Sequence, residues 1–406
     1  MTKILSYLLR LKCNILNIRL DYLAMMWNNN VMKRYLQETI SNDLKRKMVF
    51  ITGPRQVGKT FLAKSIQQEF NKTIYFNNDD IEDAKNIRNR VWPLNTNLII
   101  LDEIHKMKNW KNYLKGTFDT RSENQAFLVT GSARLDTFRQ TGDSLAGRYF
   151  LYHLNPLSVK ELFGIMSPYE VVSTLNRLGG FPEPFLSSSD EYAQRWRQQY
   201  YTDIVREDIM DFSRISEIRA IRLLIEMLRK RVGSPLSYAS LSEDLQISPN
   251  TVRKYIDILE SLHIIFIIRP YHRNIARSIL KEPKIYFYDS GYVDGDEGVR
   301  LENTVAVCLL KHVQFLYDVK GIEISLHYMR TKDGKEVDFA LAQKDVLTDF
   351  IEVKLSDSTI SRNLKYFKER YSQVNAMQLV HNIRYDKQVN DIKILQAGEW
   401  LLQLNA

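Results

Sequence analysis

Cysteine is almost absent from this chain, whose 406 residues include only Cys13 and Cys308. Two cysteines cannot build a disulfide framework or a zinc cluster, and they suit a reducing compartment, so we expect a cytoplasmic protein. Long apolar runs are absent as well. The nearest candidate, residues 4–27, is interrupted by four charged side chains, whereas a membrane-spanning helix needs about 20 apolar residues. We therefore expect no membrane span.

The start of the chain has two interpretations. We interpret residues 1–31 as an N-terminal tail that is not native, with the true start at Met25, Met26 or Met32. An amphipathic helix lying on a surface is the alternative.

The bulk composition predicts a folded protein of several domains. A chain of 406 residues exceeds the size of one hydrophobic core, so we expect two or three domains. Its 44% apolar and 26% charged residues are ordinary for a globular protein. A formal net charge of +9 permits contact with nucleic acid or an anionic surface, although solvated lysines account for it equally well.

A glycine-rich loop follows the first expected strand. Residues 47–52 are mostly apolar and lead into Gly-Pro-Arg-Gln-Val-Gly-Lys-Thr at 53–60, which matches the Walker A pattern. Glycines let the backbone turn its N–H groups toward a phosphate, and the N-terminus of the following helix adds partial positive charge. We expect Lys59 to reach the β- and γ-phosphates of ATP, and the Thr60 hydroxyl to hold Mg²⁺. The expected nucleotide-binding residues are Gly53, Pro54, Arg55, Gln56, Val57, Gly58, Lys59, Thr60 and Phe61.

Two carboxylates follow a second apolar strand. Residues 98–101 form a continuous apolar run, as in the buried strands of parallel sheets, and Asp102 and Glu103 come directly after it. Ligands of open α/β sheets bind at this end of the strands. We expect Asp102 to hold Mg²⁺ and Glu103 to polarise the attacking water. A helix N-cap is the alternative for such an acidic pair, but the upstream Walker A loop favours a Walker B segment.

A third strand ends in hydroxyl residues. Residues 126–130 are apolar and finish at Thr130, with Ser132 close behind. In P-loop ATPases with an inserted strand, a polar residue at this place senses the γ-phosphate, so both are candidates. Arg148 precedes the next strand and is the candidate for an arginine that stabilises transition-state charge, with Arg134 as runner-up.

These motifs occur in an order that resembles a known family. The segments are 51–60, 101–105, 128–132, 144–148 and 179–183. Together they look like a prokaryotic family of AAA-type ATPases, whose members join an AAA-like domain to a C-terminal region with a winged helix and a nuclease-like fold. The resemblance covers the chain from about Met32 and implies ATP and Mg²⁺ as cofactors. The chain departs from this family at Ala133-Arg134, which follow Gly131-Ser132, because relatives often carry a second small hydroxyl residue there.

Helical periodicity dominates residues 166–232, where an AAA-like protein has its helical lid. Residues 233–272 have the outline of a winged helix-turn-helix, whose second helix is expected at 251–262 with Arg253 and Lys254 facing outward. Such modules place their second helix in a DNA major groove, and they also serve as protein–protein modules. DNA, a protein partner and self-association all stay open.

The last third of the chain holds a second set of charged residues. Glu302 lies on an expected helix, Asp338 on a strand, and Glu352 and Lys354 on one face of the next strand. Carboxylates so placed can hold Mg²⁺ while a lysine orients a water. The order resembles the restriction-endonuclease-like PD-(D/E)XK fold and makes these four residues a possible second metal site. A nuclease-like fold used only for binding is the alternative.

The sequence thus predicts an α/β chain with four parts after the tail. They are a P-loop ATPase domain at 32–165, a helical lid at 166–232, a winged helix at 233–272 and a restriction-endonuclease-like α/β domain at 273–406. The leading hypothesis is Mg²⁺-dependent ATP hydrolysis coupled to a DNA-binding or nuclease-like C-terminal region. A nucleotide-gated, metal-dependent DNA nuclease and an ATP-dependent regulatory binding protein are the alternatives.

Overall fold

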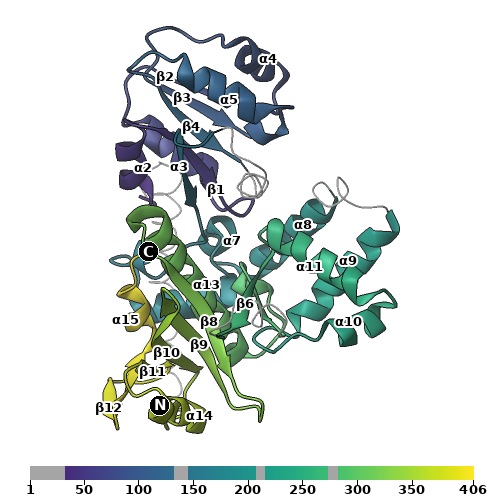
Figure 1. Cartoon of the computed structure of the whole chain (residues 1–406), viewed down its shortest axis with the longest axis vertical. Coiled ribbons are helices and arrows are strands. Elements are labelled where there is room, and N and C mark those ends of the chain that lie inside the picture. The colour runs from purple at the N-terminus through teal and green to yellow at the C-terminus, as the bar shows by residue number, and fades with distance from the viewer. Residues whose placement is uncertain (1–32, 132–144, 207–214, 273–281) are drawn as a thin grey trace, which may run out of the picture.

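The computed structural model describes residues 33–131, 145–206, 215–272 and 282–406. The expected tail, together with Ser132 and Arg134, lies outside the described residues. Figure 1 shows a first sheet at one end of the molecule, a second sheet at the other end, and the helices α8 to α11 as a lobe to the side. No helix in the described part of the chain is long and apolar enough to cross a membrane.

The first sheet has five parallel strands in the order β2-β3-β4-β1-β5. Three of them, β1, β3 and β4, are buried at every position, as expected for strands covered on both faces. The strands are β1 (Met48–Thr52), β2 (Thr73–Asn77), β3 (Leu98–Asp102), β4 (Ala126–Thr130) and β5 (Tyr149–His153). The helices of this part are α2 (Gln37–Asp43), α3 (Lys59–Gln67), α4 (Ile81–Asn89), the 3₁₀ turn η1 (Ile104–Lys106) and α5 (Trp110–Asp119).

Strand β4 lies between β1, which leads into the P-loop, and β3, which ends in the acidic pair. Ile51 is paired with Thr130, and Thr130 in turn with Asp102. This register confirms the strand that the sequence predicts between the two halves of the nucleotide site. It also brings the ends of three strands to the same edge of the sheet.

Helices fill the middle of the chain, as its periodicity predicts. Ser167 begins α6 with a capping box, and Ser248 caps α11 ahead of a proline at the first helical position. The elements are η4 (Lys160–Leu162), α6 (Pro168–Leu178), α7 (Pro182–Leu186), α8 (Asp190–Ile204), α9 (Ile215–Arg229), α10 (Tyr238–Leu245) and α11 (Pro249–Ser261).

The second sheet has eight strands in the order β12-β13-β11-β10-β9-β8-β6-β7. Strand β6 pairs with β7 on one side and with β8 on the other, so the predicted boundary at 272/273 lies between two paired strands. The strands are β6 (Ile265–Pro270), β7 (Lys284–Phe287), β8 (Ile324–Arg330), β9 (Glu336–Gln343), β10 (Val346–Lys354), β11 (Asn375–Val380), β12 (Lys387–Val389) and β13 (Ile392–Gln396). The helices are η6 (Ser290–Tyr292), α13 (Glu297–Lys320), α14 (Arg362–Arg370) and α15 (Ala397–Leu402).

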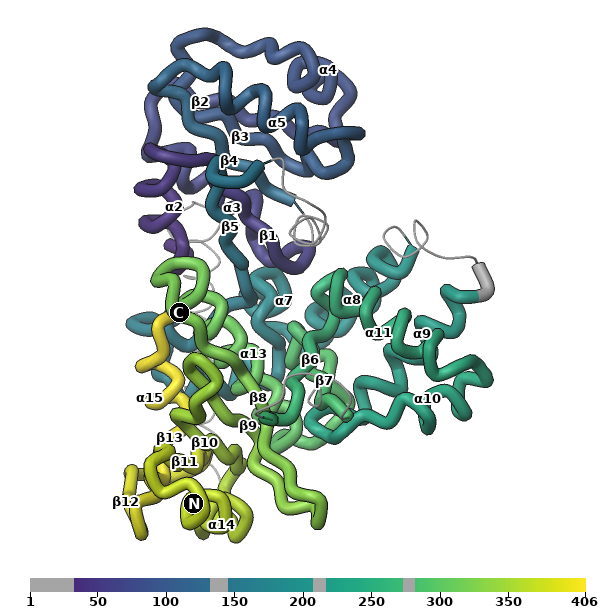
Figure 2. The backbone as a smooth tube through the Cα atoms, viewed as in Figure 1, coloured from purple at the N-terminus to yellow at the C-terminus, as the bar shows by residue number. Residues whose placement is uncertain are grey.

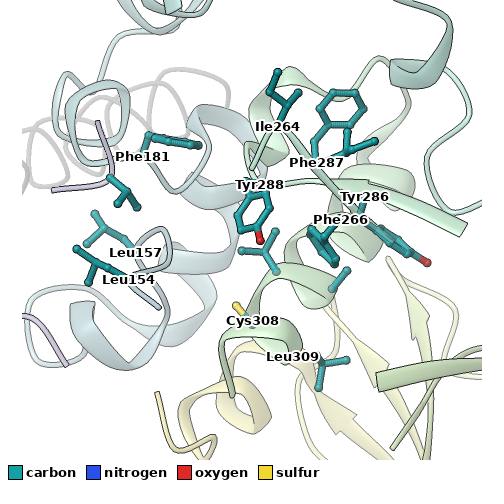
Figure 3. Close-up of a cluster of buried hydrophobic side chains, with 14 of the residues drawn as sticks. Leu154, Leu157, Phe181, Ile264, Phe266, Tyr286, Phe287, Tyr288, Cys308 and Leu309 are labelled. Atoms are coloured by element: carbon teal, nitrogen blue, oxygen red, sulfur yellow. The ribbon is translucent and has the colours of Figure 1, made fainter. Parts of the chain in front are cut away.

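One hydrophobic core connects the first sheet, the helices in the middle of the chain and the second sheet. Figure 3 shows Leu154 and Phe181 on one side, Tyr286 on the other, and Cys308 of α13 between them. Helix α13 extends toward the first sheet (Figure 2), where the carboxylate of Asp318 lies 2.7 Å from the His153 ring at the end of β5. The first sheet therefore packs against a helix of the C-terminal region rather than standing alone.

Candidate nucleotide site

The P-loop backbone has the shape that a phosphate cradle needs. Gly53 and Gly58 have φ values of +139° and +99°, a region that favours glycine, and Gln56 also has a positive φ of +57°. A Cβ added at Gly53 would lie 2.2 Å from the carbonyl oxygen of Leu154. The first glycine is therefore fixed both by its dihedral angle and by the close approach of the chain that follows β5.

Lys59 begins α3 and is buried, with 7% of its surface exposed. Its ammonium donates to the carbonyl oxygens of Gly53 and Pro54 at 2.9 and 2.6 Å. The amine thus lies inside the loop, on the concave side that the motif assigns to phosphate. Backbone N–H groups, the start of a helix and a buried ammonium together fit an anionic ligand.

Asp102 is the centre of a hydrogen-bond network at the edge of the sheet. Thr60 donates to its Oδ2 atom at 2.9 Å, the Tyr75 hydroxyl donates to the same atom at 2.6 Å, and Thr130 donates to its Oδ1 atom. The predicted pair of magnesium ligands, Thr60 and Asp102, is therefore in direct contact. A hydroxyl and a carboxylate are oxygen donors of the kind that Mg²⁺ prefers, so the residues fit this ion.

Thr130 has no exposed surface, and its hydroxyl is committed to Asp102. In this structure it orients the carboxylate, and its predicted role as a γ-phosphate sensor stays a prediction. Tyr75 was not predicted, because nothing in its own strand marks it. Only the pairing of β2 with β3 brings it beside Asp102.

Glu103 follows Asp102 with a left-handed backbone, φ +55°. Its amide donates to Asp102 and to the carbonyl of Thr130, and its Oε2 atom lies 3.5 Å from His105 Nε2. Burial raises the pKa of the Glu103 carboxyl, Lys59 opposes this shift and Asp102 adds to it. A carboxylate with a raised pKa beside the magnesium residues suits a general base.

Helix α8 lies on the outer side of the P-loop. The indole N–H of Trp196 donates to the Gln56 side chain at 2.8 Å, and the Tyr200 hydroxyl donates to the carbonyl of Arg55 at 3.4 Å. Arg34, which precedes α2, also donates to the carbonyl of Val57 at 2.8 Å. No sequence motif predicts these contacts.

Arg148 is not brought to the P-loop of its own chain. Its carbonyl accepts from Met48, the first residue of β1, whereas the P-loop follows the last residue of that strand. A strand of this length spans about 16 Å at roughly 3.3 Å per residue. The guanidinium forms a two-pronged pair with Asp119, at 2.8 and 3.0 Å. A catalytic role of Arg148 thus stays a prediction for a neighbouring chain only.

The four residues of the predicted second metal site do lie in one region, together with residues that the sequence did not suggest. Lys354 Nζ is 2.8 Å from Glu352 Oε1, and Asp338 accepts from the amide of Val353 at 2.8 Å. Burial and the charge of Asp338 raise the pKa of Glu302 to about 7, against the opposing effect of Lys284. Burial and Asp338 likewise raise the pKa of Glu352 to about 7.

These side chains do not make a metal site as they stand. Among the residues that the structure describes, no group of three or more His, Cys, Asp or Glu side chains is placed to hold a metal ion. A lysine lies among them instead: the ammonium of Lys284 in β7 is 3.5 Å from Glu302, 2.7 Å from Glu336 and 4.0 Å from Asp338. The second metal site that the sequence predicts is therefore not formed in this arrangement, where Lys284 supplies one positive charge among the carboxylates.

Comparison with known proteins covers most of the chain. Residues 45–163 match a family model described as an AAA domain, and residues 172–294 and 297–403 match two models described as domains of unknown function, DUF8612 and DUF4143. An uncharacterised protein of Mycobacterium tuberculosis is 26% identical over 78% of this chain and 73% of its own length. One of Haemophilus influenzae is 24% identical over 91% of this chain and 98% of its own length.

Among solved structures, the Walker-type ATPase of Pyrococcus abyssi aligns with 65% of this chain and 94% of its own, at 14% identity and a TM-score of 0.41. The parallel sheet, the P-loop and the match to the AAA domain agree with one another. Residues 45–163 therefore carry an AAA-like P-loop ATPase domain, joined to two regions similar to domains of unknown function.

Proposed function

We propose that this chain binds ATP with Mg²⁺ at residues 53–60 and hydrolyses it, and that the nucleotide state is transmitted to the C-terminal region. The observation that carries the proposal is the contact of Thr60 with Asp102 at 2.9 Å, with Glu103 next in the chain. A site that only bound nucleotide would not need the partly buried carboxylate of Glu103 directly beside the magnesium residues.

Each residue has a defined task in this scheme. Backbone N–H groups of the loop and the ammonium of Lys59 hold the phosphates. Thr60 and Asp102 hold Mg²⁺, which when bound neutralises charge on the phosphate oxygens. Glu103 accepts the proton of the attacking water, and the raised pKa of its carboxyl favours that proton transfer.

Helix α8 contacts both the P-loop and the C-terminal region, which supports transmission of the nucleotide state between them. Trp196 and Tyr200 contact the P-loop from this helix, and Arg197, which lies between them in the chain, pairs with Asp289 between β7 and η6. The helix thus holds the loop at one face and the start of the C-terminal region at another. A shift of the P-loop on binding ATP would be passed to Asp289 by a rigid element.

A second connection leaves the P-loop on the side of α2. Arg34 donates to the carbonyl of Val57 and pairs with Glu161 at 2.7 Å, and Glu161 pairs with Lys311 of α13. All three charged side chains are at most 2% exposed. Buried charges that are paired hold their elements in one arrangement, because separating them leaves an uncompensated charge.

Hydrogen exchange followed by mass spectrometry tests this proposal. Adding ATP and Mg²⁺ to the full chain should slow amide exchange at 53–60 and change it at 190–204 and 282–303. Lys59→Ala should abolish both effects. Lys45→Ala, at an exposed position of the same domain, should leave both unchanged. Protection limited to the P-loop would contradict transmission to the C-terminal region, and the absence of any protection would contradict ATP binding.

Nucleic acid is the second candidate partner. Helices α10 and α11 are followed by the hairpin of β6 and β7, the order of a winged helix, and Arg253 and Lys254 are exposed on α11. Together with the net charge of +9, these cations favour binding to a phosphate backbone. Fluorescence anisotropy with a labelled duplex tests it: Arg253→Ala with Lys254→Ala should weaken binding and reduce its salt dependence. Lys332→Ala is the control, and equal binding by both variants would exclude α11.

A further inference from the structure

Lys284 is an unusual lysine, because its amine is enclosed by carboxylates. Its side chain is 1% exposed. Around the ammonium lie Glu336 at 2.7 Å, Glu302 at 3.5 Å and Asp338 at 4.0 Å. The lysine comes from β7, whereas these acids come from α13 and β9. A buried lysine that stays charged needs such partners, since burial alone would favour its neutral form.

The side chains of the three acids are partly exposed, whereas that of Lys284 is buried. The side chains of Glu302, Glu336 and Asp338 are 19, 20 and 16% exposed. Two of them are held in place by further donors, since the Tyr286 hydroxyl donates to Glu302 Oε1 at 2.7 Å and the amide of Val353 donates to Asp338. These partly exposed carboxylates are therefore already held in place.

Glu352 contributes an oxygen atom that makes no hydrogen bond with the described residues. Its Oε1 atom is paired with Lys354, but its Oε2 atom is buried without a hydrogen-bond partner among the described residues. The whole residue is 4% exposed. A buried carboxylate oxygen without a donor is costly, and a cation would relieve that cost.

The acids of the cluster outnumber its cations by one. When every side chain is ionised, its four acids outnumber its three cations by one negative charge, and without Lys284 the excess would be two. The acids are Glu302, Glu336, Asp338 and Glu352, and the cations are Lys284, Arg330 and Lys354. A divalent ion would match the charge that remains when Lys284 is removed.

We propose that Lys284 is an internal counter-ion that takes the place of a divalent metal ion in this cluster. While its ammonium lies among the carboxylates, the cluster binds no Mg²⁺ or Mn²⁺ and the C-terminal region does not cleave nucleic acid by a metal-dependent route. Removal of the ammonium turns the same oxygen atoms into a divalent-metal site. This inference concerns the second sheet and is independent of the P-loop.

Titration of the nucleotide-free chain with Mn²⁺, read by electron paramagnetic resonance, tests it. Lys284→Met and Lys284→Gln should each bind one more Mn²⁺ per chain than the wild type, and adding Asp338→Asn to either should remove the gain. Lys284→Arg keeps the charge and should gain no site. Lys335→Met is the matched control, because that lysine directly precedes β9 but is 41% exposed and pairs with Asp333. Any weak metal binding at Thr60 and Asp102 is common to all the variants and cancels.

Thermal unfolding provides a second readout that also reports folding. Mn²⁺ should raise the midpoint of Lys284→Met or Lys284→Gln and leave that of the wild type unchanged, because a ligand stabilises the state that binds it. Two results would overturn the proposal. One is a wild-type chain whose bound Mn²⁺ falls on Asp338→Asn, which would show the cluster open to metal with Lys284 present. The other is folded Lys284→Gln that gains no Mn²⁺.

Discussion

Arg197 of α8 and Asp289, which lie 92 positions apart, form a buried ion pair with 2.7 Å between Nε and Oδ2. Arg197 also donates to the carbonyl of Leu178 at 2.6 Å. Two glycines make room for the pair, because a Cβ at Gly179 would lie 1.9 Å from Asp289 and one at Gly291 would lie 1.9 Å from Arg197. The pair therefore fixes the helix that touches the P-loop to the chain that leads into α13.

Breaking this pair should be costly. Arg197→Met leaves the Asp289 carboxylate, which has no exposed side-chain surface, without its cation, and we expect a loss of about 3–5 kcal/mol in unfolding free energy. Asp289→Asn should cost a similar amount, and the double variant should cost less than the sum of the two. Urea unfolding of the four proteins measures this cycle. Single variants within about 0.5 kcal/mol of the wild type would show that the pair does not hold the regions together.

Gly53→Ala should abolish ATP binding. The substitution places a Cβ 2.2 Å from the Leu154 carbonyl at a φ of +139°, so the phosphate loop must move. Two features of Gly53 oppose a side chain, its positive φ and its steric contact with Leu154. Gly164→Ala tests the positive φ alone, since Gly164 has a φ of +91° but no atom within 4 Å of an added Cβ. Calorimetric titration with ATP should therefore show binding by Gly164→Ala and none by Gly53→Ala. Equal affinities would mean that the close approach of Leu154 does not shape the site.

The Arg34–Glu161–Lys311 group predicts a defined response to acid. Burial raises the pKa of Glu161, but Arg34 and Lys311 outweigh it and lower the pKa from 4.5 to about 2. The folded state thus binds the proton less readily than the unfolded state. The stability contributed by Glu161 is complete above pH 4.5 and is lost as the pH falls toward 2.

A comparison of the wild type with Glu161→Gln measures this contribution. The gap between their unfolding midpoints should be widest near neutral pH, where it reflects about 3 kcal/mol, and should narrow as the pH falls below 4.5. Glu123→Gln, at an exposed position outside this group, is the control and should follow the wild type at every pH. A gap that does not change with pH would contradict the role of Glu161.

Much of the nucleotide site could be predicted from the sequence because its residues are close together in the chain. Residues 53–60 form one loop, Asp102 and Glu103 stand together at the end of β3, and continuous apolar runs mark the buried strands that lead to them. The motifs are enough to expect that Thr60 and Asp102 share the magnesium ion, whereas the contact of Thr130 with Asp102 depends on the register of β3 and β4. Local geometry and short motifs carry this information.

The contacts that cross the molecule could not be predicted in this way. Trp196 reads as an ordinary core position of an amphipathic helix, and only the packing of α8 brings it to Gln56. Lys284 reads as a charged residue beside a short apolar strand, and only the pairing of β6 with both β7 and β8 carries it to Asp338. The prediction for the second cluster named Glu302, Asp338 and Glu352, and it missed both Glu336 and the cation Lys284 that lies among the carboxylates.

ATP turnover is the most direct test of the central claim. Phosphate release by the full chain should require ATP and Mg²⁺ and should be lost in Lys59→Ala. Glu103→Gln should still bind ATP but turn it over about 10²–10⁴ times more slowly, the usual contribution of a general base, while Glu123→Gln should match the wild type. A wild type that releases no phosphate, or a Glu103→Gln variant as fast as the wild type, would contradict the assignment of this P-loop as a hydrolytic site.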